Sequence, residues 1–219
     1  MHNLTFTTPR TARYLLLGEP GPAIEQVWVC LHGHGQSLAE LADSLHLVNA
    51  STRLLLLPEG LSRFEVPTDD AALPRTGAAW FASDSLLADL ADLGAYLDAL
   101  TQEVLAACSP GMPLTVFGHG HGAAAACRWL AGNGTGYTQL ILHDAVFPAQ
   151  IDRRATLVAL PERPVLVVTT TTPDAIEATE AGLLQDLLDV GLSARHYRAD
   201  AGPLPLAVLA PAATQGSQT

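Results

Sequence analysis

The stretch Leu114-Thr115-Val116-Phe117-Gly118-His119-Gly120-His121-Gly122 decides how this chain folds. Its first four residues have the length and apolar character of a buried strand, and the Ala-rich segment that follows has the composition of a helix. Gly118 and Gly122 allow the strand to turn sharply into that helix. At the apex of the turn stands Gly120, which has no side chain. The stretch therefore predicts a strand–turn–helix unit whose apex carries no reactive group.

Length and composition place the chain among globular proteins. Its 219 residues suffice for one α/β domain with a full hydrophobic core, and 48% of them are hydrophobic against 15% charged. We expect residues 1–210 to form a single domain and the small, polar residues 211–219 to form a disordered tail. The formal net charge of −11 argues against binding nucleic acid or anionic membrane surfaces, because both require a basic footprint.

No segment of the sequence resembles a membrane or export signal. No run of about 18 apolar residues is free of charges and helix breakers. Residues Met1–Thr5 lack the basic and apolar regions of a secretory signal. The three cysteines, Cys30, Cys108 and Cys127, show neither metal-ligand nor redox spacing. They are typical of buried thiols in a reducing compartment, so we expect a cytoplasmic protein.

Apolar runs of strand length alternate with segments of helical period. The runs are continuously apolar, which is typical of strands buried on both faces. The predicted strands are Tyr14–Leu17, Val27–Leu31, Leu54–Leu57, Leu114–Phe117, Leu140–Leu142 and Val165–Val168. The predicted helices are Leu38–Leu45 after an N-cap Ser37, Asp84–Ala107 after an N-cap Ser83, Ala123–Trp129, and Ala175–Val190 before Gly191. Glu65–Arg75 is predicted to be a surface loop. The alternation predicts a mostly parallel sheet with helices on both faces.

Further motifs give the chain a resemblance to a known family. They read Pro9-Arg10-Thr11-Ala12-Arg13-Tyr14, Leu31-His32-Gly33-His34-Gly35-Gln36, Pro58-Glu59-Gly60-Leu61-Ser62-Arg63-Phe64 and Gly77-Ala78-Ala79-Trp80. Together with the strand–turn–helix stretch, they resemble the small bacterial esterases of the phospholipase/carboxylesterase group of α/β-hydrolases, from about Pro9 to about Gly202. The resemblance implies an α/β-hydrolase fold, in which the turn is the G-x-S-x-G nucleophile elbow.

The resemblance also implies a catalytic triad, and the sequence departs from it at each position. In the family a Ser at the elbow attacks the ester, a His accepts its proton, and an Asp orients that His. Gly120 occupies the Ser position, Pro173 aligns most nearly with the Asp, and Asp174 is one residue late. No histidine follows His196, although the family has its catalytic His after a final strand. We therefore expect a pseudo-esterase without Ser–His–Asp activity.

The oxyanion hole that the resemblance implies depends on backbone groups, which remain. His34 and His121 occupy the positions whose N–H groups form it, with side chains that can simply point outward, and His32 belongs to the His-Gly pair that shapes the loop. Buried N–H groups without a partner are costly, so we expect ordered water or a small anion there. The retained function would be binding a small molecule, an anion or a protein partner in the old pocket.

Histidines near this pocket support an alternative, metal-dependent hydrolase. Loops at the carboxyl ends of neighbouring strands converge, and three neutral imidazoles plus water would make an open catalytic zinc site. The candidate ligands are His34, His119, His121 and His143. No carboxylate is obviously placed as a general base, so the sequence favours the pseudo-esterase. We accordingly expect no cofactor, with a divalent metal such as Zn at the histidine cluster as the alternative.

The other pocket candidates also have structural interpretations. His32 would hold its loop by hydrogen bonds. His143 and Asp144 would form a pair at a strand end, or a functional unit in which the carboxylate orients the imidazole. Trp80 and Phe81 would line the acyl pocket or belong to the core.

Overall fold

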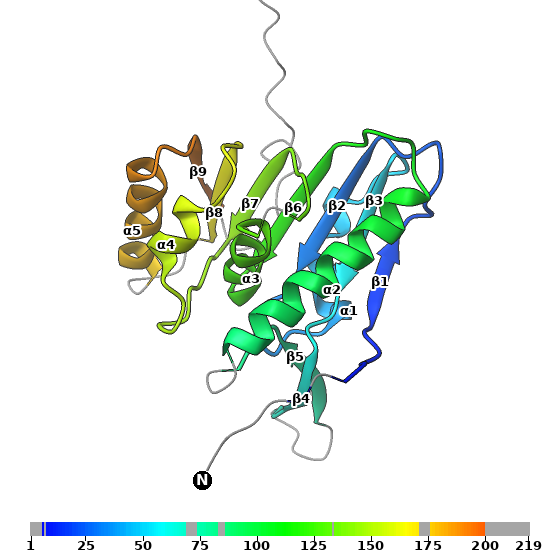
Figure 1. The fold of residues 1–219 in the computed structure, drawn as a ribbon, viewed down its shortest axis with the longest axis horizontal. Helices are drawn as coiled ribbons and strands as arrows, with labels where there is room; N and C mark the ends of the chain where they lie inside the picture. The colour runs from blue at the N-terminus through cyan, green and yellow to red at the C-terminus, as the bar shows by residue number, and fades with distance from the viewer. Residues whose placement is uncertain are drawn as a thin grey trace, which may run out of the picture.

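A seven-stranded sheet runs through the middle of the computed structural model, which describes residues 6, 8–68, 74–82, 86–132, 134–170 and 176–199 (Figure 1). Its strands, in spatial order, are β1 (Tyr14–Leu17), β3 (Arg53–Pro58), β2 (Gln26–Leu31), β6 (Leu114–His119), β7 (Gln139–His143), β8 (Val165–Thr170) and β9 (Ala194–Ala199). Within this sheet β1 is antiparallel to β3, and the other described pairs are parallel. The carboxyl ends of β2, β6 and β7 therefore meet at one edge, in the lower part of Figure 1.

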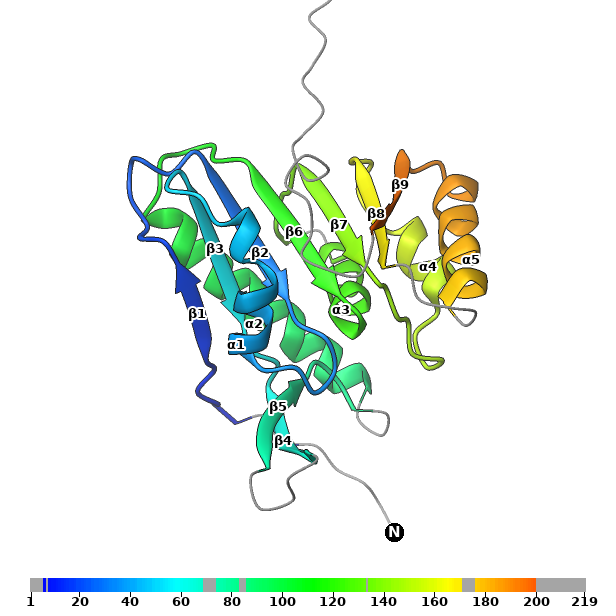
Figure 2. The same cartoon turned by 180° about the vertical axis from the view of Figure 1, so that it is seen from behind.

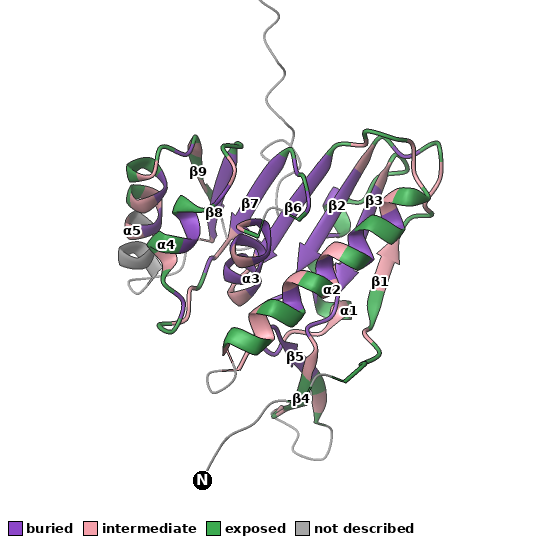
Figure 3. Ribbon diagram, viewed as in Figure 1, coloured by how far each residue is buried: buried purple, intermediate pink, exposed green. Residues whose placement is uncertain are grey.

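Side chains alternate between the two faces of the sheet, and each face has its own core. Val27, Val29 and Leu31 of β2 pack in one hydrophobic cluster, whereas Trp28 and Cys30 pack in the other. The first cluster lies beneath α2 (Leu86–Ala106), α3 (His121–Leu130), α4 (Arg153–Val158) and α5 (Ile176–Asp189). The second lies beneath α1 (Leu38–Ser44) and the 3-10 helix η1 (His46–Val48), visible from behind in Figure 2. Figure 3 shows the resulting burial of the central strands.

The observed sheet confirms the predicted architecture, a mostly parallel sheet with helices on both faces. All six predicted strands are present, and most extend by a residue or two beyond the apolar run that predicted them. Ser37 caps α1 in a capping box with Glu40, as its position predicts. Gly191 ends α5 with φ +80°, a conformation that glycine adopts without a Cβ clash. The predicted cap Ser83 lies outside the described residues.

The structure also contains elements that the sequence patterns did not predict. Strands β4 (Ser62–Val66) and β5 (Arg75–Ala79) pair antiparallel, so the surface loop predicted over Glu65–Arg75 is wrong at both ends. These strands and β9 are partly exposed and carry polar residues or glycine, so they lack a continuous apolar run. Helix α4 is short as well. The predicted tail 211–219 lies outside the described residues. Within the described chain no helix has the length and apolar character to cross a membrane.

Candidate functional site

The turn between β6 and α3 has the geometry of a nucleophile elbow. Gly120 adopts φ 54° and ψ −122°, a conformation that a residue with a Cβ adopts only with strain. A Cβ on Gly118 would lie 2.5 Å from the Cα of Ala123, and one on Gly122 would lie 2.4 Å from the carbonyl oxygen of Leu31. These two glycines are therefore required by close packing. A Cβ on Gly120 would meet nothing nearer than the Cα of Gly33 at 3.6 Å, so the apex has room for a side chain that this chain does not supply.

Backbone hydrogen bonds fix the apex against the loop that follows β7. The N–H of Gly120 donates to the carbonyl of His143 over 3.0 Å, and the carbonyl of Gly120 accepts from the N–H of Val146 over 3.0 Å. It also accepts from the N–H of Ala123 over 3.1 Å, at the start of α3. The elbow conformation is thus held by its neighbours rather than by a side chain at its apex.

His32 has the structural role that one interpretation of the sequence gave it. Its Nδ1 donates to the carbonyl of Gly33 over 2.7 Å, and its Nε2 accepts from the N–H of Gly60 over 2.9 Å. Both ring nitrogens are therefore engaged, and burial lowers the pKa of the imidazole to about 4. The ring stacks on Trp80 with centroids 4.6 Å apart, and Trp80 Nε1 donates to the His32 carbonyl over 2.8 Å. Trp80 is 4% exposed and belongs to the core.

The β4–β5 hairpin contacts the loop that follows β2, residues 32–36, from the side opposite the elbow. The N–H of Gly35 donates to the carbonyl of Ala78 over 2.9 Å, and Arg75 Nη1 donates to the carbonyl of Gly35 over 2.6 Å. The same guanidinium lies 3.0 Å from a carboxylate oxygen of Glu40. A Cβ on Gly77 would lie 2.2 Å from the carbonyl oxygen of Gly35, so strand and loop are in direct backbone contact. The hairpin therefore positions the loop that follows β2. The sequence pattern predicts a surface loop over part of this hairpin and so does not indicate this role.

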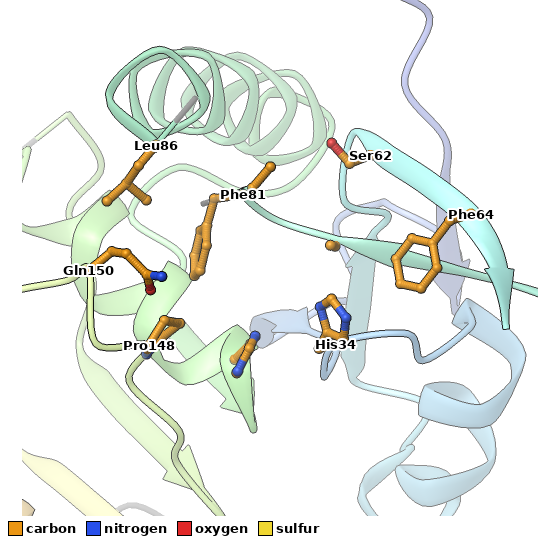
Figure 4. A pocket seen from close by; sticks show the side chains of 10 residues that line it. His34, Ser62, Phe64, Phe81, Leu86, Pro148 and Gln150 are labelled. Carbon is orange, nitrogen blue, oxygen red and sulfur yellow. The ribbon is translucent and has the colours of Figure 1, made fainter. Parts of the chain in front are cut away.

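His34, which is exposed, and His121, which is half-buried, both line a cavity of about 510 Å³ beside the elbow. Their ring centroids are 5.2 Å apart, and the ring of His34 lies 5.2 Å from that of Phe64 (Figure 4). Burial, and then the neighbouring His34, lower the pKa of His121. The remaining wall is mostly apolar and includes Phe64, Phe81, Leu86 and Pro148. Phe81 thus lines this cavity, whereas Trp80 does not.

The backbone N–H groups of His34 and His121 have no hydrogen-bond partner among the described residues. His121 is the first residue of α3, so its N–H belongs to the unpaired donors at the positive end of the helix dipole. Two backbone N–H groups without protein partners are the kind of donors that an oxyanion hole uses.

A second pair of histidines, His119 and His143, lies at the ends of β6 and β7. They are directly opposite each other in the register of these strands, and their ring centroids are 5.0 Å apart. His143 Nε2 lies 3.2 Å from Asp144 Oδ2 and 3.2 Å from Thr170 Oγ1. Asp144 in turn accepts from the backbone N–H of Thr170 over 2.7 Å and from its hydroxyl over 2.8 Å. Burial lowers the pKa of both imidazoles, and the charge of Asp144 opposes that shift.

The four histidines of the sequence-based metal hypothesis thus form two pairs rather than one cluster. Within the described chain, the group of potential ligands that converges is His119, His143 and Asp144, whose ligand atoms all lie within 4.8 Å of one another. Gln36 and Thr170, which contact His119 and Asp144, were not among the site residues predicted from the sequence. Gln36 lies in the loop after β2, and Thr170 is the last residue of β8. The position of each at or just after the carboxyl end of a strand is the sequence feature that could have indicated them. Pro173 and Asp174 lie outside the described residues.

No protein-family model and no curated protein matches this chain. Solved structures do match it. The esterase PE8 is 17% identical with a TM-score of 0.65, covering 88% of this chain and 91% of that one. A phospholipase/carboxylesterase from Dyadobacter fermentans is 16% identical with a TM-score of 0.59, covering 90% and 91%. Acyl-protein thioesterase 2 from Zea mays is 18% identical with a TM-score of 0.58, covering 89% and 94%. The chain therefore has the α/β-hydrolase fold.

Proposed function

We propose that this α/β-hydrolase-fold protein is a pseudo-esterase that binds a small molecule in the cavity beside the elbow. The observation that carries the proposal is Gly120, which has the strained conformation of a nucleophile elbow, and room for a side chain, but no hydroxyl or thiol. Three of the described histidines near the turn have polar partners for their side chains: His32 contacts Gly33 and Gly60, His119 contacts Gln36, and His143 contacts Asp144 and Thr170. Because Gly120 carries no hydroxyl, none of these imidazoles has a nucleophile at the apex to activate.

The chemistry of the cavity supports a ligand with an apolar body and an anionic or carbonyl head. Phe64, Phe81 and Leu86 offer an apolar wall, which favours burial of hydrocarbon. At the elbow, the N–H groups of His34 and His121 offer two donors for an oxygen, and the dipole of α3 favours negative charge. A short-chain carboxylate combines both features.

Two assays test the proposal. A fluorophosphonate probe should leave the protein unlabelled, and short-chain p-nitrophenyl esters should turn over at the rate of the buffer. Calorimetric titration should show that hexanoate binds and that hexanol, which lacks the charge, binds more weakly. Stoichiometric labelling of any serine would overturn the proposed loss of catalysis.

A matched pair of variants tests the head-group site. His121→Ala removes the imidazole and keeps the backbone donor, whereas His121→Pro removes both. Proline is well tolerated at the first position of a helix, so α3 should persist by circular dichroism. We expect hexanoate to bind His121→Pro about tenfold or more weakly than His121→Ala, since a hydrogen bond to a charged group contributes roughly 1.5–3 kcal/mol. Equal affinities would show that the donor is not used.

A further inference from the structure

We propose that His119, His143 and Asp144, none of which lines the ligand cavity proposed above, bind one divalent transition-metal ion of the zinc or iron(II) type. Two imidazole nitrogens and one carboxylate oxygen are the protein ligands of open catalytic zinc sites and of the facial triads that hold iron(II). The three ligand atoms lie within 4.8 Å of one another. The inference does not depend on the proposed pseudo-esterase function.

The ligand spacing is already close to that of a metal site. Two ligands at about 2.1 Å from one ion are roughly 3.0–3.4 Å apart in tetrahedral or octahedral geometry. His143 Nε2 and Asp144 Oδ2 are 3.2 Å apart, within that range. An ion between them would replace the proton that they share, because a ligating imidazole must be unprotonated at the binding nitrogen. The ligand atom of His119 lies within 4.8 Å of both, so its ring would move closer to complete the set.

The sheet explains why these side chains converge. His119 and His143 end neighbouring parallel strands at the same register position, so both side chains project to one side. Asp144 follows with φ +44°, and it is the single described non-glycine residue with a positive φ. Asp adopts this region more readily than most residues. The turn directs its carboxylate to Thr170 and His143, where two hydrogen bonds from Thr170 hold it.

Gln36 orients His119 as an outer-shell residue orients a metal ligand. The N–H of Gly33 donates to Gln36 Oε1 over 2.8 Å, which identifies that atom as an acceptor. His119 Nδ1 lies 3.3 Å from the same oxygen and must therefore donate to it. The lone pair of the neutral ring is then on Nε2, the nitrogen left for an ion. A ligating histidine that donates its other N–H to a fixed oxygen is the usual arrangement around protein-bound metals.

One of the three ligands can be reached from solvent. A cavity of about 520 Å³ is lined by His119, together with Gly33, Gln36 and Gly120, and His34 and His121 line it as well. Because Gly120 has no side chain, nothing at the apex covers His119 from this cavity. An ion held by three protein ligands would keep a coordination position open for water or for a carboxylate, as catalytic sites do and closed structural sites do not.

The test is metal binding by tag-free, chelator-treated protein. Calorimetric titration with Zn²⁺ should show one ion per chain, and Co²⁺ should give the visible absorption of a four- or five-coordinate ion. His143→Ala and Asp144→Asn should each weaken Zn²⁺ binding about 100-fold or more, because each removes or weakens a ligand. Gln36→Ala should weaken it about 10–100-fold, the usual effect of losing an outer-shell partner. His46→Ala, at an exposed residue, should leave the affinity unchanged.

Other outcomes would overturn the assignment. If Zn²⁺ binding is lost in His34→Ala and retained in His143→Ala, the metal belongs to the other histidine pair. A thiolate charge-transfer band in the Co²⁺ spectrum would assign the ion to Cys108, the one cysteine that is not fully buried. If the unmodified protein binds no stoichiometric metal ion, the proposed site is refuted. This outcome does not depend on whether the variants fold.

Discussion

Gly120→Ser restores the hydroxyl that the elbow lacks, and we expect it to destabilise the protein. The new Cβ meets nothing closer than 3.6 Å, so the change carries no steric cost. The cost comes from the backbone, because φ 54° and ψ −122° are natural for glycine and strained for serine. Strain of this kind is about 1–3 kcal/mol. In a chain of 219 residues, each kcal/mol of destabilisation lowers the melting temperature by about 2–4 °C. The expected strain therefore lowers it by about 2–12 °C.

Two matched variants separate backbone strain from the added hydroxyl. Gly136→Ser lies in open space and has no positive φ, so its free energy of unfolding should stay within about 0.5 kcal/mol of the parent. Gly111→Ser also has open space but a φ of +76°, so it should be destabilised, as Gly120→Ser is. Urea unfolding of the three variants measures the comparison. If Gly120→Ser is as stable as Gly136→Ser, the apex backbone is not strained for serine and the prediction is refuted. Robust esterase activity of Gly120→Ser would instead reveal a general base that the described contacts do not show.

Three further predictions concern buried groups. The free energy of unfolding should fall as the pH drops from about 6.5 to 4, because the unfolded His32 ring takes up a proton in this range and the folded ring, with its pKa lowered to about 4, does not. His32 alone should contribute up to roughly 3 kcal/mol of this loss. A free energy of unfolding that stays constant over this pH range in urea titrations would contradict the prediction. Trp80→Phe should cost about 1–3 kcal/mol more in urea unfolding than Trp28→Phe, because Trp80 Nε1 donates to a buried carbonyl, whereas Trp28 Nε1 has no partner among the described residues. Iodoacetamide should modify Cys108 in the folded protein and spare Cys127, which is buried and whose thiol pKa is raised to about 12; mass spectrometry that finds Cys127 modified first would oppose this.

The buried strands were predictable because their environment imposes a simple pattern. A strand covered on both faces must be apolar at every position, and Leu54–Leu57 and Val165–Val168 show this directly. The β4–β5 hairpin shows no such pattern, since residues such as Arg63 and Glu65 are exposed and β5 contacts the loops at Gly35 and Gly60. Its pairing is set by tertiary contacts that no local window contains.

The site was predictable in its location but not in its pairings. Histidines at strand ends indicate the carboxyl edge of the sheet, and all of the candidates that the structure describes lie there. Which of them meet depends on register: His119 faces His143 because β6 and β7 align these two residues. His121 follows the turn and begins α3, so its side chain leaves the sheet and meets His34 instead. Neither the register nor the direction of the turn is encoded in the spacing His-x-His.

The different constraints on His32 and Gly120 have an evolutionary consequence. His32 connects Gly33, Gly60 and Trp80, so replacing it disrupts the packing that the whole loop needs in order to fold. A side chain at the apex would contact little, whereas glycine there relieves backbone strain. Selection for stability therefore preserves His32. It also favours replacement of the nucleophile by glycine once catalytic turnover is no longer required. In such a lineage the sequence motif of the loop persists after the catalytic activity is lost. A search that recognises the family by this motif will therefore assign activity to proteins that no longer have it.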